Sequence, residues 1–135
     1  MSERRRRVGD HMTAAPVCIQ LDAELEHAVK LMQEHGIRHL PVMDGEDLTG
    51  VVTDRDLAMI ESLLPEEWQR ICVAEAMTPE PYSVTPDAPL WEVAKHMARE
   101  KFGCAVVTDE GGAVVGLFTT TDALNVLADV TEHEG

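Results

Sequence analysis

The chain has 135 residues, of which 44% are hydrophobic, and this is enough for one ordinary folded domain with a sizeable core. With 11 Lys and Arg against 25 Asp and Glu, the formal net charge is −14, which disfavours general binding to nucleic-acid phosphate. No apolar stretch reaches the ~20 residues that a membrane span needs, and none follows the basic run at residues 4–7 as a secretory signal would require. We therefore expect a cytoplasmic protein with no membrane contact and a basic N-terminal tail over residues 1–7.

The first half of the chain predicts five elements in the order strand, helix, strand, strand, helix. They are a strand at 17–20, a helix from Leu25 to a stop at Gly36, strands at 40–43 and 48–53, and a helix from Asp54 to about residue 64. Apolar residues at 25, 28, 29 and 32 have the spacing of one buried helix face, and Asp22 is placed to cap this helix.

The second half predicts the same five elements. They are a strand at 82–85, a helix from Leu90, strands at 105–108 and 113–119, and a helix from Thr120 to about residue 128. Asp87 is the matching cap, and because Lys101 stands where the first helix has Gly36, we expect the second helix to run on to Gly103. Between the halves, Pro65 followed by two acidic residues is a helix-start signature, which favours a rigid link.

The two halves are an internal repeat. At an offset of 65, Met12, Thr13 and Pro16 align with Met77, Thr78 and Pro81. An insertion at 110–112 changes the offset to 66, which aligns 50–56 with 116–122. We therefore expect one repeat at 8–64, a short linker at 65–72 and a second repeat at 73–130. A half of about sixty residues would be marginal alone, so the two are expected to pack their sheets together and share one core.

Three motifs in order carry a family resemblance: Val8–Thr13 (VGDHMT), Gly36–Val42 (GIRHLPV) and Gly50–Leu57 (GVVTDRDL). Together they resemble the cystathionine-β-synthase (CBS) domain, and the second half resembles another copy, so residues 8–130 look like the tandem pair called a Bateman module. This resemblance implies an α/β (α+β) fold of two pseudo-twofold-related β-α-β-β-α repeats. It also implies clefts between the repeats that bind adenine nucleotides or related adenosyl ligands, regulation of an unidentified partner protein, a flat homodimer, and no catalysis or cofactor of its own.

The motif at residues 50–56 also has a physical interpretation. Where a strand ends and a helix begins, free backbone N–H groups and the positive end of the helix dipole favour a phosphate, and the Thr53 hydroxyl could donate there. One turn later the Asp56 carboxylate can accept hydrogen bonds from both hydroxyls of a ribose. The resemblance implies this ribose and phosphate role for Thr53 and Asp56 and for their counterparts Thr119 and Asp122.

The remaining candidate ligand contacts fall into two groups. Residues expected near the adenine, by the same resemblance, are Val17, Cys18, Leu40, Tyr82, Ser83 and Ala105. Residues expected to touch phosphate through their charge are Arg38, His39 and Arg55, and the second half has Gly103, Cys104 and Thr121 at these positions. In an acidic protein a few cations decide where an anion binds, so the two sites are expected to be unequal.

Other interpretations remain open from the sequence. A Thr-x-x-Asp motif is also close to a capping box, in which both side chains serve only the helix start. His35 and His39 have the nominal spacing of metal ligands, but Gly36 argues against a continuous helix there, and we expect no metal site. No nucleophile or phosphate-loop motif is present, so we expect no enzyme. The alternative function is a structural, protein-interaction dimerisation module with no physiological nucleotide.

Overall fold

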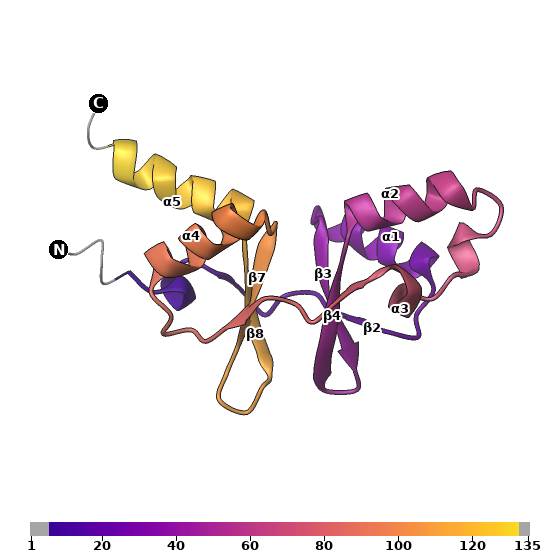
Figure 1. Cartoon of the computed structure of the whole chain (residues 1–135), viewed down its shortest axis with the longest axis horizontal. Coiled ribbons are helices and arrows are strands. Elements are labelled where there is room, and N and C mark those ends of the chain that lie inside the picture. The colour runs from indigo at the N-terminus through magenta and orange to yellow at the C-terminus, as the bar shows by residue number, and fades with distance from the viewer. Residues whose placement is uncertain (1–5, 133–135) are drawn as a thin grey trace. The chain divides into compact units, whose positions relative to one another are not determined.

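The computed structural model of the chain describes residues 6–132, which fold into two compact units. Unit 1 takes Met1–Pro16 and Tyr82–Gly135, and unit 2 takes Val17–Pro81. Each unit combines one four-stranded sheet with helices, as the coloured ribbon in Figure 1 shows. The predicted α+β class is therefore confirmed. Of the basic run at residues 4–7, only Arg6 and Arg7 lie within the described part of the chain.

Unit 2 contains a sheet with the strand order β2-β3-β4-β5. Its elements are β2 (Ile19–Gln20), α1 (Leu25–His35), β3 (His39–Asp44), β4 (Asp47–Thr53), α2 (Asp54–Leu63), the 3-10 helix η3 (Trp68–Arg70), α3 (Val73–Ala76) and β5 (Thr78–Pro79). β2 runs parallel to β3, and the other neighbours are antiparallel. The strand, helix, strand, strand, helix order that the sequence predicts is confirmed here, and the link after α2 is a turn followed by η3.

Unit 1 repeats this arrangement with the strand order β1-β8-β7-β6. Its elements are the 3-10 helix η2 (Val8–Asp10), β1 (Thr13–Ala14), β6 (Ser83–Val84), α4 (Leu90–Glu100), β7 (Cys104–Thr108), β8 (Val114–Thr119) and α5 (Thr120–Glu132). β6 is parallel to β7, and β1 is antiparallel to β8.

Each unit contains a short segment from the start of the sequence repeat that forms most of the other unit. β1 and η2, from the start of the first repeat, complete unit 1 by pairing with β8, and β5 and α3, from the start of the second repeat, complete unit 2 by pairing with β4. We call residues 6–14 and 71–79 the exchanged segments. The sequence repeats and the compact units therefore divide the chain at different places.

The exchanged segments also cap the first helix of each unit. The Leu25 N–H at the start of α1 donates to the Ile71 carbonyl at 2.8 Å, and the Leu90 N–H of α4 donates to the Arg6 carbonyl at 2.9 Å. The expectation that Asp22 and Asp87 cap these helices is wrong. The N-cap residues come later, at Glu24 and Pro89, without side-chain cap bonds, because a backbone carbonyl already satisfies the first amide.

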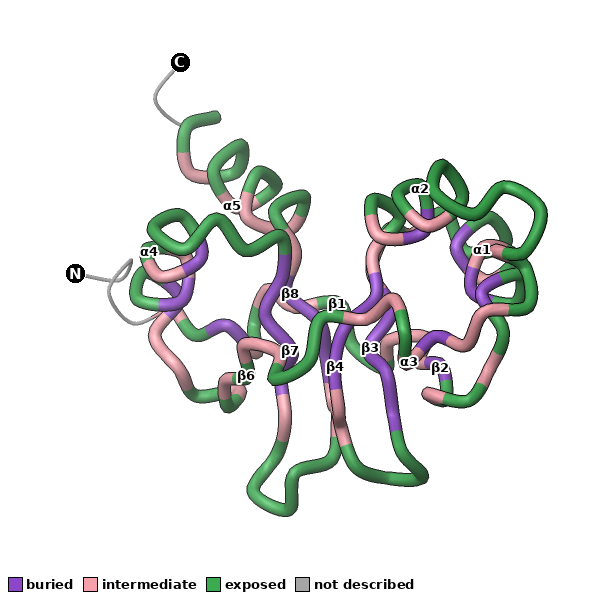
Figure 2. The backbone as a smooth tube through the Cα atoms, turned by 45° about the vertical axis from the view of Figure 1, so that its right-hand side comes forward, coloured by how far each residue is buried: buried purple, intermediate pink, exposed green. Residues whose placement is uncertain are grey.

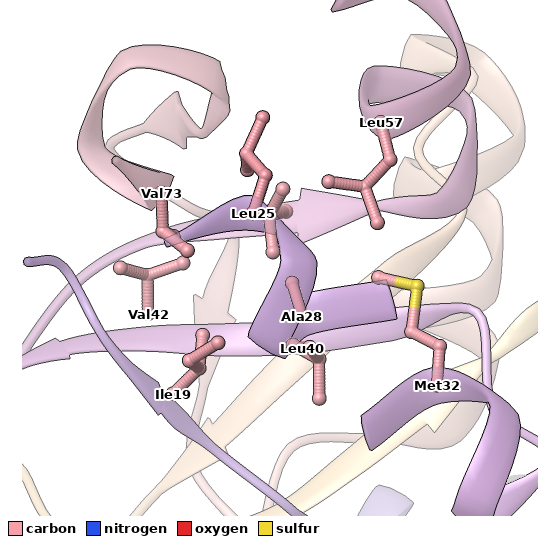
Figure 3. Packing of buried hydrophobic residues seen from close by; sticks show 9 residues of the cluster. Ile19, Leu25, Ala28, Met32, Leu40, Val42, Leu57 and Val73 are labelled. Carbon is pink, nitrogen blue, oxygen red and sulfur yellow. The ribbon is translucent and has the colours of Figure 1, made fainter. Parts of the chain in front are cut away.

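Two hydrophobic clusters lie among the described residues, one in each unit. In unit 2, Figure 3 shows Leu25, Ala28 and Met32 of α1 facing strand residues, with Leu57 of α2. The unit 1 cluster is formed by Val8, Leu90, Val93, Met97, Ala105, Val107 and Phe118. The exchanged segments contribute Val73 to one cluster and Val8 to the other, both fully buried. Figure 2 shows that burial is concentrated in the long strands and that the hairpin turns are exposed.

The helix ends differ from expectation in unit 1. α4 does not run on to Gly103 but ends at Glu100, because Lys101 adopts the left-handed conformation (φ 62°), as Gly36 does after α1. The Phe102 N–H then donates to the Met97 carbonyl at 3.0 Å, which closes the helix end. α5 extends past residue 128, to Glu132. None of the helices within residues 6–132 is long and apolar enough to cross a membrane.

The two segments that connect the units contain matched left-handed residues. Ala15 has φ 50° and Glu80 has φ 52°, and each lies shortly after an exchanged strand. A non-glycine residue in this region costs about 1 kcal/mol or more, so the surrounding contacts must hold the backbone there.

Two strand glycines allow the exchanged strands to approach closely. A Cβ at Gly50 would lie 2.6 Å from the Thr78 carbonyl oxygen and 2.8 Å from Met77 Sδ. A Cβ at Gly116 would overlap the side chain of Met12. The obstacle at Gly50 includes backbone, whereas the obstacle at Gly116 is a flexible methionine.

We expect Gly50→Ala to lower the free energy of unfolding by about 1–3 kcal/mol, because β5 must shift, and Gly116→Ala to lower it by less, because Met12 can change rotamer. Urea denaturation of the full chain measures both. Gly111→Ala is the control, since its Cβ would be 3.5 Å from the nearest atom, Asp109 Oδ1. Equal losses for Gly50→Ala and Gly116→Ala would contradict this account of strand exchange.

Candidate functional site

The junction of β4 and α2 in unit 2 is closed by a capping box. The Thr53 N–H donates to Asp56 Oδ2 at 2.9 Å, and the Asp56 N–H donates to Thr53 Oγ1 at 3.2 Å. The capping interpretation of the Thr-x-x-Asp motif is therefore confirmed. These bonds also fix both side chains at the positively polarised end of α2, where an anion is favoured.

The capping box uses only one oxygen of the Asp56 carboxylate. Within the described chain, Oδ1 of Asp56 accepts no hydrogen bond, and the side chain is half-buried. A carboxylate oxygen held in this way can accept hydrogen bonds from two neighbouring hydroxyls of a ligand. Capping and ligand binding by Asp56 are therefore compatible.

Unit 1 has the same junction between β8 and α5, with two additional bonds, one of which the Thr119 hydroxyl donates to Asp122 Oδ2 at 3.2 Å. The Thr119 N–H donates to Asp122 Oδ2 at 2.9 Å, and the Asp122 N–H donates to Thr119 Oγ1 at 3.2 Å. The Thr13 hydroxyl of the exchanged segment donates to Asp122 Oδ1 at 3.3 Å. The sequence analysis did not place Thr13 at the site, although its alignment with Thr78 marked it as a repeated residue.

The candidate phosphate contacts gather in unit 2. His39 begins β3 and is paired with Thr53 across the sheet, and the Arg38 carbonyl accepts the Asp54 N–H at 3.0 Å. Arg55 is exposed near the start of α2 and makes no ion pair with any described residue. The cationic side chains that the sequence selected therefore belong to residues at the same end of one sheet.

The protonation of His39 is set by its surroundings. Burial lowers its pKa from the ordinary value, and the positive charge of Arg38 acts in the same direction, while the carboxylates of Asp54 and Asp56 partly oppose both. His39 therefore favours the neutral imidazole, which can donate one hydrogen bond and accept another.

The candidate adenine contacts differ in accessibility. Val17 and Cys18, which precede β2, and Tyr82, which precedes β6, are half-buried, and Ser83 at the start of β6 is exposed. The side chains of Leu40 and Ala105 are fully buried in the two hydrophobic clusters. The residues before and at the start of β2 and β6 are thus the accessible part of this set.

The cysteines near these positions are not reactive nucleophiles at neutral pH. Burial raises the pKa of Cys104 to about 11 and raises the pKa of Cys18 as well. The thiolate is the reactive form, so both side chains act there as small, neutral groups.

The family model described as CBS domain matches residues 8–62 and 73–129 of this chain. A CBS domain-containing protein of Dictyostelium discoideum is 33% identical over 131 residues, with 90% of each chain covered. Inosine-5'-monophosphate dehydrogenase of Korarchaeum cryptofilum is 33% identical over 122 residues, and the present chain spans 24% of its length.

Three solved structures with the same fold are similar to this chain over nearly its whole length, and the second and third contain bound ligands. The AcuB protein of Vibrio cholerae superposes with a TM-score of 0.83 at 29% identity, covering 96% of this chain and 97% of AcuB. CBSX2 of Arabidopsis thaliana in complex with AMP gives 0.79 at 26%, covering 93% and 98%. The CBS domain pair of MJ0100, in complex with 5'-methylthioadenosine and S-adenosyl-L-methionine, gives 0.80 at 25%, covering 92% and 97%.

We expect His39 to make stability dependent on pH. Because its pKa is lowered in the folded state, the unfolded chain takes up the proton first as the pH falls through about 6.5. The contribution of His39 to stability is thus present above that pH and is lost below it. The free energy of unfolding should fall more steeply between about pH 7.5 and pH 5.5 in the wild type than in His39→Gln.

Urea titrations at several pH values measure this difference, and the other five histidines are common to both proteins. Parallel pH profiles would show that His39 is equally solvated in the folded and unfolded states, contrary to the structure.

Proposed function

This chain belongs to the CBS domain family as a tandem pair of repeats, and from that premise we propose that it is a regulatory module that senses an adenosine-containing ligand. AMP, ADP, ATP or a related adenosyl compound binds at the helix-start junctions of the two units. Binding changes the affinity of the module for a partner protein, because a ligand that prefers one conformation shifts the equilibrium toward it.

The observation that carries the proposal is the state of the Asp56 carboxylate. One oxygen is fixed by the Thr53 amide, and the other has no partner among residues 6–132. A fixed, half-buried carboxylate with a free oxygen matches the paired hydroxyls of a ribose, which is the part common to all adenosyl ligands. Asp122 offers the same group, on which a ribose would share or replace the Thr13 hydroxyl.

The phosphate of a nucleotide would lie at the start of α2. Arg55 is exposed there and makes no ion pair within residues 6–132, and Arg38 and His39 lie at the start of the neighbouring strand β3. Together with the positive end of the α2 dipole, these groups oppose the negative field of a chain whose net charge is −14. The adenine would lie against the accessible residues that precede β2 and β6.

The ligand-bound structures support the ligand class. CBSX2 binds AMP, and MJ0100 binds 5'-methylthioadenosine and S-adenosyl-L-methionine, each in a chain that this one matches over more than nine-tenths of its length. The common part of these ligands is adenosine. The regulated partner is a protein outside this chain.

A second candidate function is a protein-interaction module that forms homodimers, and α5 favours it. Figure 2 shows no buried segment in α5, and none of its residues is buried. Leu124 and Leu127, on adjacent turns, remain 63% and 55% exposed. Exposed leucines at this spacing form an apolar stripe suited to a second protein surface. The sensing proposal accommodates a homodimer, whereas this alternative requires no ligand.

We expect Asp56→Asn and Asp122→Asn each to weaken binding of AMP or another responding adenosyl ligand by about ten- to a hundredfold at its own unit, because a charge-assisted hydrogen bond is lost. Asparagine retains an oxygen for the capping box, whereas alanine would remove the cap and destabilise the helix. A thermal-shift panel of AMP, ATP and S-adenosylmethionine identifies the ligand, because a ligand at 100 times its Kd adds about 2.7 kcal/mol to the stability of the folded state. Calorimetry then measures the affinity of the variants for that ligand.

Asp47→Asn and Asp129→Asn are the matched controls, since each removes one exposed carboxylate from the same unit away from the junction. A flat panel with the wild-type protein, or equal binding by the junction variants and the controls, would contradict the sensing function.

For the interaction surface, we expect the wild type to be dimeric at micromolar concentration and Leu124→Glu to be monomeric, because a buried unpaired charge opposes association. Light scattering after size exclusion measures the mass. Asn125→Glu, on the same helix, is the control. A monomeric wild type would exclude the homodimer.

A further inference from the structure

Three aromatic rings meet in unit 1 beside the candidate adenine residues. The ring centroids of Tyr82 and His96 lie 4.4 Å apart, and Phe102 lies 5.7 Å from each of them. The rings are tilted by 36° to 56° and do not form a parallel stack among themselves. We call these three residues the aromatic cluster.

The aromatic cluster lies at the same end of the sheet as the Thr119–Asp122 capping box. Tyr82 directly precedes β6, and its carbonyl accepts the Val106 N–H at 2.8 Å from β7. Phe102 is followed by Gly103, whose carbonyl accepts the N–H of Thr120, the first residue of α5, at 3.1 Å. Cys104, next along the chain, pairs with Thr119 across the sheet. The backbone therefore places the ring-bearing residues and the capping box at the same end of the unit 1 sheet.

The rings are not explained by core packing alone. Phe102 remains 39% exposed, whereas its counterpart Ile37 is partly buried against the core of unit 2. Tyr82 is partly buried against the unit 1 cluster. At an offset of 65, the counterparts of the three rings are the aliphatic residues Val17, Leu31 and Ile37. The chain has only five Trp, Tyr and Phe residues, so two of them beside a histidine at one junction is a marked local enrichment.

The two junctions also differ in charge, and here unit 2 has the additional side chains. Unit 2 has Arg38 and Arg55, and unit 1 has Gly103 and Thr121 at the matching positions. The unit 1 junction therefore offers aromatic surface without these cations, and the unit 2 junction offers these cations with the His39 imidazole but without a Phe, Tyr or Trp at the positions that match the cluster. Aromatic rings stack on a purine base, whereas arginine binds phosphate.

We propose that the two junctions differ in the ligand class that they select: the unit 1 junction binds a purine nucleoside by stacking on the aromatic cluster and does not select for a phosphate, whereas the unit 2 junction selects a phosphate-bearing nucleotide. Asp122 holds the ribose of the nucleoside, and Phe102, the most exposed ring, supplies the stacking face together with Tyr82. This division rests on the proposed sensing function and specifies the ligand class at each junction.

Calorimetry with adenosine and AMP tests the division in two backgrounds. In Asp56→Asn, where unit 1 is the functional junction, the two ligands should bind with Kd values within about threefold of each other, because no cation at the matched positions rewards the phosphate. In Asp122→Asn, AMP should bind at least about tenfold more tightly than adenosine, because the Arg38 and Arg55 side chains are retained.

The ring substitutions test the stacking itself. In the Asp56→Asn background, Phe102→Ile, which installs the residue of unit 2, should weaken adenosine binding by about tenfold, and Phe102→Tyr should retain it. Because Tyr82 is the only tyrosine of the chain, labelled tyrosine gives one set of ring signals, and these should shift upfield when adenosine stacks. Ile37→Phe is the reciprocal variant, expected to strengthen adenosine binding in the Asp122→Asn background.

The outcomes separate this proposal from the sensing function. Unchanged adenosine affinity in Phe102→Ile, with normal thermal stability and with binding still lost in Asp122→Asn, would overturn the stacking and leave the sensing function intact. Tighter binding of AMP than of adenosine at unit 1 would overturn the division in the same way. If the wild type binds neither of these ligands, nor ATP or S-adenosylmethionine, and the tyrosine signals do not move, both the division and the sensing function are wrong.

Discussion

The exchange of one short segment between the two repeats is the constraint on which the rest of the structure depends. Residues 6–14 and 71–79 each supply a carbonyl that caps the first helix of a unit, a fully buried valine for its core, and a two-residue strand for its sheet edge. Without these segments, the start of each helix would have an unsatisfied amide and the edge of each long hairpin would be open. Because Gly50 and Gly116 have no side chain, the exchanged segments can lie directly against them.

This exchange also explains why the candidate sites are built as they are. Each junction lies where the last strand of a hairpin passes into the following helix, and the hairpin is held on its outer side by an exchanged strand. In the capping box, one carboxylate oxygen accepts a hydrogen bond from a backbone N–H, and this fixes the direction in which the other oxygen points. In unit 1 the exchanged strand reaches the site directly through the Thr13 hydroxyl, so the same segment that completes the fold also contacts the candidate ligand group.

The sequence predicts the parts of this structure that depend on local pattern. Helix periodicity, strand alternation and the repeated Gly-x-x-Thr-x-x-Asp motif place the elements and the capping boxes correctly. The exchange was missed because Ile71 and Leu25, or Arg6 and Leu90, are distant in sequence and interact through backbone atoms, which leave no residue signature. The aromatic cluster was missed for a related reason, since Phe102 reaches Tyr82 only after Lys101 ends the helix in a left-handed turn that Lys rarely adopts.

The left-handed residues Ala15 and Glu80 lie in connectors only a few residues long. Thr13 donates to the Asp122 carboxylate in unit 1, and four residues later Val17, a candidate adenine contact, belongs to unit 2. The other connector runs in the same way from Thr78 in unit 2 to Tyr82 in unit 1. The Thr13 contact with Asp122 and the candidate adenine residue Val17 are therefore separated by only three residues, and one of these, Ala15, has a left-handed backbone. Under the proposed sensing function, the two connectors would be the shortest covalent paths along which binding at one junction could be linked to binding at the other.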